Sequence, residues 1–165
     1  MSQLAHIPES EMKEILMLQE RLKLMDSQEK CKESFMEYIR YIWPGFIEGD
    51  HHRIIAEKLT EVAQGKCKRL IVNMPPRHTN SEFASVYFPS WIMGLKPEMK
   101  IMQTTHTADL SINFGRKVRN LMDTPEYNNI FSNVSLASDS KSAGKWQTSA
   151  GGEYFAAGVG GAIAG

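Results

Sequence analysis

The chain has 165 residues, of which 42% are hydrophobic and 23% charged, and its 19 lysines and arginines balance 19 aspartates and glutamates. This composition is that of an average globular protein, and it excludes an intrinsically disordered chain and a uniformly basic nucleic-acid coat. No stretch reaches the ~18 apolar residues that a membrane span needs, and the polar, acidic start resembles neither a secretory nor an amphipathic leader. Two cysteines, Cys31 and Cys67, are too few for a disulfide scaffold or a zinc site, so we expect reduced thiols in a cytosolic protein.

The first third of the sequence predicts helices. Apolar residues recur every three or four positions over residues 10–25, after a cluster of glutamates that suits a helix N-terminus. Asp26, followed three residues later by Glu29, has the pattern of a capping box and predicts the start of a second helix, which Pro44-Gly45 ends.

A third helix is expected from Asp50 to Gly65. We expect the apolar residues of all three helices to pack in a core or between helices. Residues 1–48 are therefore interpreted as an N-terminal helical region, and residues 49–165 as a second region of different character.

From residue 70 onward the pattern is typical of an α/β protein. The apolar run Leu70–Met74 predicts a buried parallel strand, followed by a helix from Ser81 to about Gly94. A second strand is expected over Lys100–Thr105, and Thr107 or Asp109 caps the next helix. Strand, loop, helix, strand and helix in this order predict βαβ units on a parallel sheet.

The last part of the sequence predicts a short helix around Tyr127 and then a β-hairpin. Residues 145–148 and 153–156 form its two strands, on either side of a Ser-Ala-Gly-Gly turn.

The segment after the predicted strand at 70–74 has the context of a phosphate-binding loop. Such a loop reads G-x-x-x-x-G-K-[ST], because backbone N–H groups and a lysine bind the phosphates and a hydroxyl binds Mg²⁺. Placing Ser81 at the hydroxyl position puts Asn80 at the lysine position and Thr79 at the second glycine. Only the hydroxyl survives from the motif, so the pattern alone leaves a plain β–α connection open.

The run RLIVNMPPRHTNSEF, residues 69–83, resembles the nucleotide-binding segment of tailed-bacteriophage terminase large subunits, where the loop reads N-M-P-P-R-H-G-K-S or N-M-P-P-R-H-T-K-S. Other short runs follow in the order of that family: WPG at 43–45, DHHRIIA at 50–56, SWIMG at 90–94, ADL at 108–110, FGR at 114–116, PEY at 125–127 and GVGG at 158–161. The resemblance spans roughly residues 35–165, and the first 34 residues have no specific match.

The resemblance implies a RecA-like P-loop NTPase core, a parallel sheet with helices on both faces. It implies that residues 49–165 are the first half of the ATPase domain, truncated before the Walker B strand and before the nuclease domain. The implied activity is ATP hydrolysis that drives double-stranded DNA into a capsid, and the full-length family also cuts DNA as an endonuclease. ATP and Mg²⁺ are the implied cofactors.

The implied partners are double-stranded DNA, the portal and the small terminase subunit, with a homo-oligomeric ring for the full-length protein and no membrane. The implied location is the host-cell cytoplasm, outside the virion structure. A truncated sheet would expose an unpaired edge, so we expect poor solubility or association of the chain alone.

Carried over residue by residue, the resemblance implies a nucleotide site in one loop and on the helix before it. Its residues are Pro76, Arg77, His78, Thr79, Asn80, Ser81, Glu82 and His52. Ser81 is the implied Mg²⁺ ligand, through ATP, and Arg77 and Asn80 are the implied catalytic residues. His51 or His52 would contact the base, although a histidine at a helix start also has a plain structural interpretation.

Asn80 departs from the family where the family has lysine. A unit charge ~4 Å from a phosphate contributes on the order of 4 kcal/mol at an effective dielectric of ~20, and a neutral amide does not supply it. Arg77 offers a guanidinium that would compensate in part. An inactive variant, an engineered substitution and a sequence error remain open, and we expect the truncated chain alone to be inactive.

Arg116, Lys117 and Arg119 form the densest basic cluster of the second half, and they are candidate contacts to DNA phosphates or a solvated helix face. Two alternative functions stay beside the motor. One is a non-catalytic P-loop-like module for binding or assembly, which Asn80 favours. The other is a different RecA-like ATPase such as a helicase, against which the Met-Pro-Pro-Arg-His loop argues.

Overall fold

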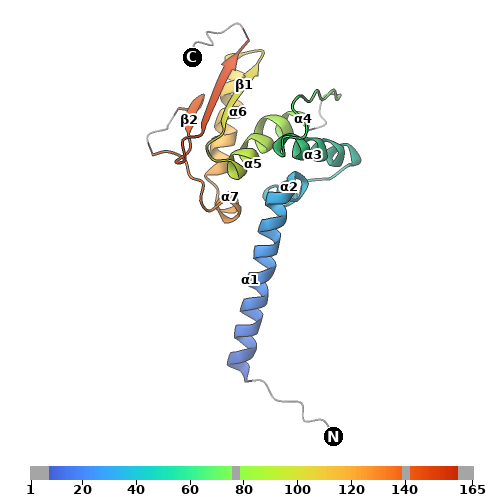
Figure 1. Ribbon diagram of the computed structural model, residues 1–165, viewed down its shortest axis with the longest axis vertical. Coiled ribbons are helices and arrows are strands. Elements are labelled where there is room, and N and C mark those ends of the chain that lie inside the picture. Colours follow the sequence, from blue (N-terminus) through green and yellow to red (C-terminus); the bar gives the residue numbers. More distant parts are fainter. Residues whose placement is uncertain (1–7, 76–78, 139–141, 160–165) are drawn as a thin grey trace.

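The computed structural model describes residues 8–75, 79–138 and 142–159 as a mixed α/β structure, in which helices pack beside a small three-stranded sheet (Figure 1). The elements in chain order are α1 (Glu9–Glu33), α2 (Phe35–Ile42), α3 (Asp50–Ala63), α4 (Asn80–Glu82), the π-helix η1 (Phe83–Tyr87), α5 (Phe88–Leu95), β1 (Lys100–Thr105), α6 (Ala108–Met122), α7 (Pro125–Ile130), β2 (Lys145–Gln147) and β3 (Glu153–Gly158).

The first helix is longer than the sequence pattern predicts. The prediction of a new helix at Asp26 is wrong, because α1 runs unbroken to Glu33 and Asp26 pairs with Lys30 one turn later, at 2.6 Å. No proline or glycine interrupts this stretch, so nothing stops the helix. The real boundary is Ser34, which is extended and whose hydroxyl accepts a hydrogen bond from the backbone N–H of Glu37.

The apolar residues of α1 do not pack in a core, which corrects the expectation for residues 10–25. The helix projects away from the body of the structure, and only its last turns contact α2 and α7 (Figure 1). Cys31 is the one buried residue of α1. The apolar residues before it are exposed: Met12, Ile15, Leu16, Met17, Leu18, Leu22, Leu24 and Met25.

The sheet has the order β1-β3-β2, with β1 and β3 parallel and β2 and β3 antiparallel. Helix α6 lies between β1 and β3 in sequence and packs on both, so β1, α6 and β3 form a βαβ unit. The strand at 100–105, the short helix around Tyr127 and the hairpin are thereby confirmed. So is Thr107 as the cap of α6, since its hydroxyl accepts from the N–H of Leu110.

The predicted strand Leu70–Met74 does not form, because this segment has no strand partner among the described residues. It still alternates as a strand does. Leu70, Val72 and Met74 pack against the core, whereas Ile71 is 86% exposed. A β-ladder needs a neighbouring backbone with which to exchange hydrogen bonds, and apolar pattern alone cannot supply one.

An aromatic core joins α2 to the helical segment 80–95. Phe35 is fully buried, and its ring lies 5.4–5.8 Å from the rings of Phe83, Phe88 and Trp91. The indole of Trp91 donates to the carbonyl of Cys31 at 2.7 Å, which fixes the end of α1 on this core. The core thus draws on both sides of residue 48, and the division of the chain at that residue stays a prediction.

Both cysteines are free, as expected. Burial raises the pKa of the Cys31 thiol to about 11, and the thiol donates to the carbonyl of Glu37.

The connection between α2 and α3 is held by one carboxylate. Glu48 accepts hydrogen bonds from Arg40 at 2.8 Å and from Arg53 at 2.5 Å. These two guanidinium groups lower the pKa of Glu48 to about 2. Because the charged form is favoured in the folded state, the carboxylate stabilises the fold at neutral pH.

Glu48→Gln is expected to lower the free energy of unfolding at pH 7, and the difference from the wild type should shrink as the pH falls from about 5 toward 2. The folded pKa lies below the unfolded value of ~4.3, so the contribution is complete above that value and is lost as the folded carboxylate is protonated. Urea unfolding at several pH values measures the difference. Glu57→Gln on the exposed side of α3 is the control, and an equal pH dependence in both variants would contradict the assignment.

Candidate functional site

The predicted phosphate loop lies between the extended segment 70–75 and the helical segment 80–95. Pro76, Arg77 and His78 fall outside the described residues. Thr79 to Glu82 are described, and they form the turn into the helix and its first turn.

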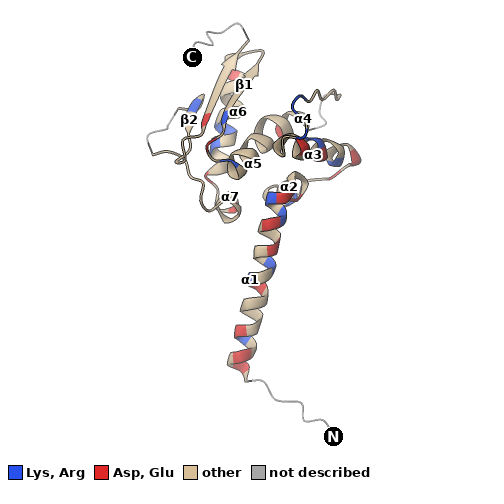
Figure 2. Cartoon of the chain, viewed as in Figure 1, with Lys and Arg blue, Asp and Glu red and all other residues tan. Residues whose placement is uncertain are grey.

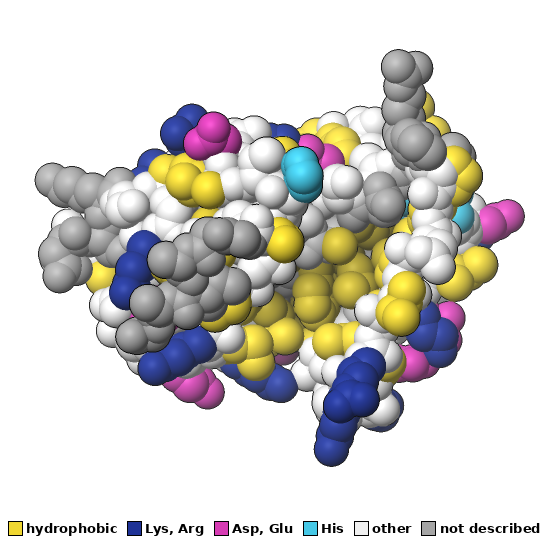
Figure 3. All heavy atoms as spheres, turned by 90° about the horizontal axis from the view of Figure 1, so that it is seen from above, with side chains coloured by type: hydrophobic (Ala, Val, Ile, Leu, Met, Phe, Trp, Pro, Cys, Tyr) yellow, Lys and Arg dark blue, Asp and Glu magenta, His cyan; other side chains and the backbone are white. Residues whose placement is uncertain are grey.

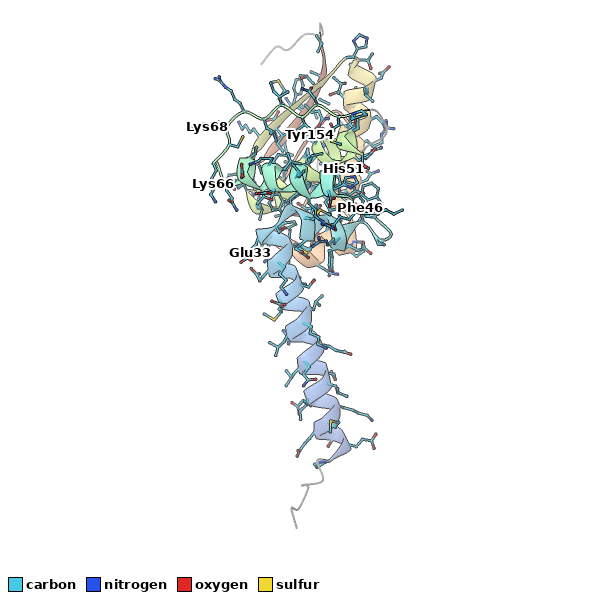
Figure 4. The ribbon with its side chains drawn as sticks, turned by 90° about the vertical axis from the view of Figure 1, so that its right-hand side faces the viewer. Glu33, Phe46, His51, Lys66, Lys68 and Tyr154 are labelled. Carbon is cyan, nitrogen blue, oxygen red and sulfur yellow. The ribbon has the colours of Figure 1, made fainter. Side chains whose placement is uncertain are left out.

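His52 connects the lead-in helix α3 to this loop. The side chain is 5% exposed, and its Nδ1 accepts the backbone N–H of Gly49 at 3.0 Å, which caps the start of α3. Since Nδ1 is an acceptor, Nε2 carries the ring proton and donates to the hydroxyl of Thr79 at 2.9 Å. The ring is packed between Phe46 and Phe83, with centroids 4.8 and 5.2 Å away, and Figure 4 marks Phe46 beside this end of α3.

Thr79 holds a backbone conformation that favours glycine. Its φ is +61°, the left-handed region, where a β-branched side chain is strained. Its carbonyl accepts the N–H of Phe83 at 3.0 Å, the first hydrogen bond of the helical segment. The phosphate-loop pattern places a glycine here, so this sharp left-handed turn agrees with the assigned register of the loop.

Asn80 and Ser81 follow directly at the start of the helical segment. Asn80 is the first residue of α4, and Ser81 is exposed on its first turn. The first N–H groups of a helix have no intrahelical acceptor, and the hydroxyl of a serine there adds an oxygen ligand. Such N–H groups can bind an anion such as a phosphate, and the hydroxyl can bind the cation that accompanies it.

An ion pair between Glu82 and Lys117 joins the predicted nucleotide loop to the predicted DNA cluster on α6. The Lys117 ammonium lies 2.6 Å from the Glu82 carboxylate and 5.8 Å from the ring centre of Phe114. The ion pair fixes α6 beside the first turn of the helical segment. Lys117 of the predicted DNA cluster is therefore paired with a residue of the predicted nucleotide loop.

The other two cluster residues differ in their surroundings. Arg116 is exposed on α6, and Arg119 is half-buried and donates to the side-chain oxygen of Asn120 at 3.4 Å. Exposed arginines suit a phosphate backbone, but α6 also offers them as an ordinary solvated face.

The helical segment 80–95 is irregular just before Pro89. Residues 83–87 are π-helical, and the N–H of Phe88 reaches the carbonyl of Phe83, one residue further back than in an α-helix. Such π-turns often mark sites where a side chain must be placed off the regular α-helical path. Pro89 lies in the first turn of α5, directly after this stretch, and Trp91 is buried.

Two grooves contribute to an apolar hollow in the structure. One part is a groove of about 350 Å³ between α3 and the segment 70–74, lined by His51, Ile54, Lys58 and the segment itself. A second groove of about 470 Å³ runs between η1, α5 and β1. Figure 3 shows the hollow from above as an apolar floor between the sheet and the extended segment.

Within the described part of the chain, no group of three or more His, Cys, Asp or Glu side chains is placed to hold a metal ion. Among the described helices, none combines the length and apolarity needed to cross a membrane.

Sequence reasoning missed two long-range contacts of the segment 79–82. The His52–Thr79 bond joins residues 27 positions apart and the Lys117–Glu82 pair joins residues 35 apart, and no local pattern signals either contact. The Ser34-Phe35-Met36-Glu37 run, by contrast, has the S-x-x-E pattern of a helix start and would have located α2.

Comparison of the chain with known proteins gives no matching family model, no matching curated protein and no matching solved structure.

Proposed function

We propose that this chain is the nucleotide-binding part of a viral DNA-packaging ATPase of the terminase large-subunit type, in which residues 76–82 bind the phosphates of ATP·Mg²⁺. The observation that carries the proposal is the bond from His52 to Thr79. It holds the loop at Thr79, the one described residue other than glycine with a left-handed backbone, directly before the helix start. A phosphate loop needs such a fixed turn, because its backbone N–H groups must already point at the ligand.

The arrangement of the sheet supports the same proposal. A RecA-like core needs a strand before the phosphate loop and parallel strands beside it, and residues 70–74 are extended next to an apolar hollow. The β1–α6–β3 unit supplies the parallel part. We propose that further strands of a larger ATPase domain fill the hollow and pair with β1 and with residues 70–74.

In this proposal the loop binds ATP·Mg²⁺ but contributes little to its hydrolysis. The Ser81 hydroxyl would be the Mg²⁺ ligand, and the N-terminus of the helical segment would face the phosphates. An asparagine amide is neutral where a lysine would neutralise charge, so stabilisation of the charge that develops on the phosphates would be weak. Arg77 is the cation nearest in sequence that would contribute.

The larger protein would couple ATP hydrolysis to the movement of double-stranded DNA into a capsid and would also cut DNA. Its partners would be the portal, the small terminase subunit and further copies in a ring, in the host-cell cytoplasm. Arg116 on α6 would contact the DNA backbone, close to the nucleotide through the Lys117–Glu82 pair.

The test is the affinity for ATP·Mg²⁺ of the wild-type chain and of Asn80→Lys. We expect weak binding by the wild type and about tenfold tighter binding by the variant, a difference of ~1.4 kcal/mol, because the added ammonium pairs with the phosphates. Isothermal titration calorimetry in excess MgCl₂ measures both.

Asn129→Lys is the control, since it makes the same substitution on an exposed position of α7. It should bind ATP like the wild type. An absence of binding by both the wild type and Asn80→Lys, when both unfold cooperatively, would sink the assignment of the loop.

A second candidate is a non-catalytic P-loop-like module that serves binding or assembly. Asn80 favours it, because the residue removes the cation on which phosphoryl transfer depends. Two results together would favour this module over the motor. The first is nucleotide binding that Asn80→Lys strengthens, and the second is the absence of ATP hydrolysis by a longer protein that includes the proposed further strands.

A further inference from the structure

We infer that α1 pairs in parallel with the α1 of a second copy of this chain, through a seam of Ile15, Leu18, Leu22 and Met25. The inference concerns a surface far from the loop and is independent of the proposed nucleotide site.

The first observation is that α1 leaves the body of the structure without cover. The middle of the projecting part carries few charges in Figure 2, and its side chains extend into solvent on all sides in Figure 4. Leu22 is 65% exposed and Leu24 is 46% exposed. Soluble monomers rarely leave so many large apolar side chains uncovered on one element.

The second observation is the stability of the helix itself. Helical stability in proteins comes mainly from the packing of an apolar face rather than from helix propensity. Only the end of α1 near Cys31 is packed, by α2 and α7. A partner helix along the projecting part of α1 would supply the apolar packing that the rest of this chain does not provide.

The third observation is the spacing of the seam. Ile15, Leu18, Leu22 and Met25 follow each other at intervals of three, four and three residues, which are the a and d positions of two consecutive heptads. The first heptad has isoleucine at a and leucine at d, the combination that favours a two-stranded parallel pair, and the second has Leu22 at a and Met25 at d. Leu16, Met17 and Leu24 fall at b and c positions, away from such a seam.

Charge selects the parallel direction. With Ile15 at a, Arg21 is at g and Asp26 is at e of the next heptad. In a parallel pair, g of one helix faces this e of the other, so Arg21 of each copy faces Asp26 of its partner. An antiparallel pair of the same residues would bring Arg21 opposite Arg21 of the second copy. Asp26 also binds Lys30 of its own helix at 2.6 Å. Its carboxylate has two oxygens, so it can accept from Lys30 and from Arg21 of the second copy.

The proposal is tested on the whole chain by sedimentation equilibrium over a range of concentrations. We expect a monomer–dimer equilibrium, which Leu22→Glu shifts at least tenfold toward monomer because it buries a charge in the seam. Leu24→Glu makes the same substitution at an outer position of the same helix and should leave the equilibrium unchanged. Neither substitution touches the core, and cooperative unfolding verifies that each variant is folded.

A charge exchange tests the direction. Arg21→Glu and Asp26→Arg should each weaken the dimer, and the double variant should restore it, because the pair is re-formed with its signs reversed. In an antiparallel pair the double variant would place two glutamates opposite each other and would not recover.

A purely monomeric wild type at the highest concentration would overturn the proposal. So would association that Leu22→Glu leaves unchanged, since it would come from the open sheet edge instead. The two proposals fail separately. A variant that no longer binds ATP but still forms the dimer bears only on the nucleotide site, and a monomeric variant that still binds ATP bears only on the α1 seam.

Discussion

Phe35→Ala is expected to lower the free energy of unfolding by about 3–5 kcal/mol. The ring is fully buried and contacts Tyr38 on its own helix and Phe83, Phe88 and Trp91 across the core. Its removal leaves a cavity among rigid aromatic rings that cannot collapse into it. Urea unfolding followed by tryptophan fluorescence measures the loss, because Trp91 lies against the same ring.

Two controls show whether burial is the cause. Phe35→Leu retains most of the volume and should cost clearly less than Phe35→Ala. Phe155→Ala makes the same substitution on a half-buried residue of β3 and should also cost less. An equal loss at Phe155 would show that the aromatic core does not have the central place assigned to it.

His52→Ala is expected to lower the free energy of unfolding by about 3 kcal/mol and to abolish ATP binding by the loop. The substitution removes the cap on Gly49, the bond to Thr79 and the packing between Phe46 and Phe83. Each hydrogen bond contributes ~1 kcal/mol, and the lost aromatic packing accounts for the remainder. Chemical unfolding and titration with ATP·Mg²⁺ measure the two effects.

Thr79→Val separates the tether from the packing. Valine keeps the shape and the branching of threonine but removes the hydroxyl, so it should cost only ~1 kcal/mol. It should nevertheless weaken ATP binding, because the loop loses its anchor to α3. Wild-type affinity in Thr79→Val would show that the His52–Thr79 bond has only a structural role.

Local patterns predicted elements well where each element carries its own signal. Thr107 was identified as a cap because its hydroxyl reaches an N–H three residues away, a distance within one turn of chain. The strand at 100–105 and the hairpin were predicted correctly because alternation and a Gly-Gly turn are also local. The false capping box at Asp26 is the exception, since an acidic residue followed by a glutamate also occurs inside a helix that nothing interrupts.

The segment 70–74 shows where local patterns fail. Its residues have the composition of a buried strand, and they do alternate between core and solvent, yet no ladder forms because no described strand pairs with them. The same limit applies to β3, whose parallel partner β1 could not be identified from the hairpin pattern. Strand pairing depends on residues about 50 positions apart, which no local window contains.

By itself, the sequence determined the helical character of the first third, the strand at 100–105, the cap at Thr107 and the hairpin. Those features arise from hydrogen bonds and apolar spacings within a few residues. Only the tertiary structure decided that His52 anchors Thr79, that Lys117 pairs with Glu82, and that the apolar side chains of α1 stay uncovered. Each of these depends on which distant surfaces meet, because burial and pairing are properties of the packed chain and not of any one segment.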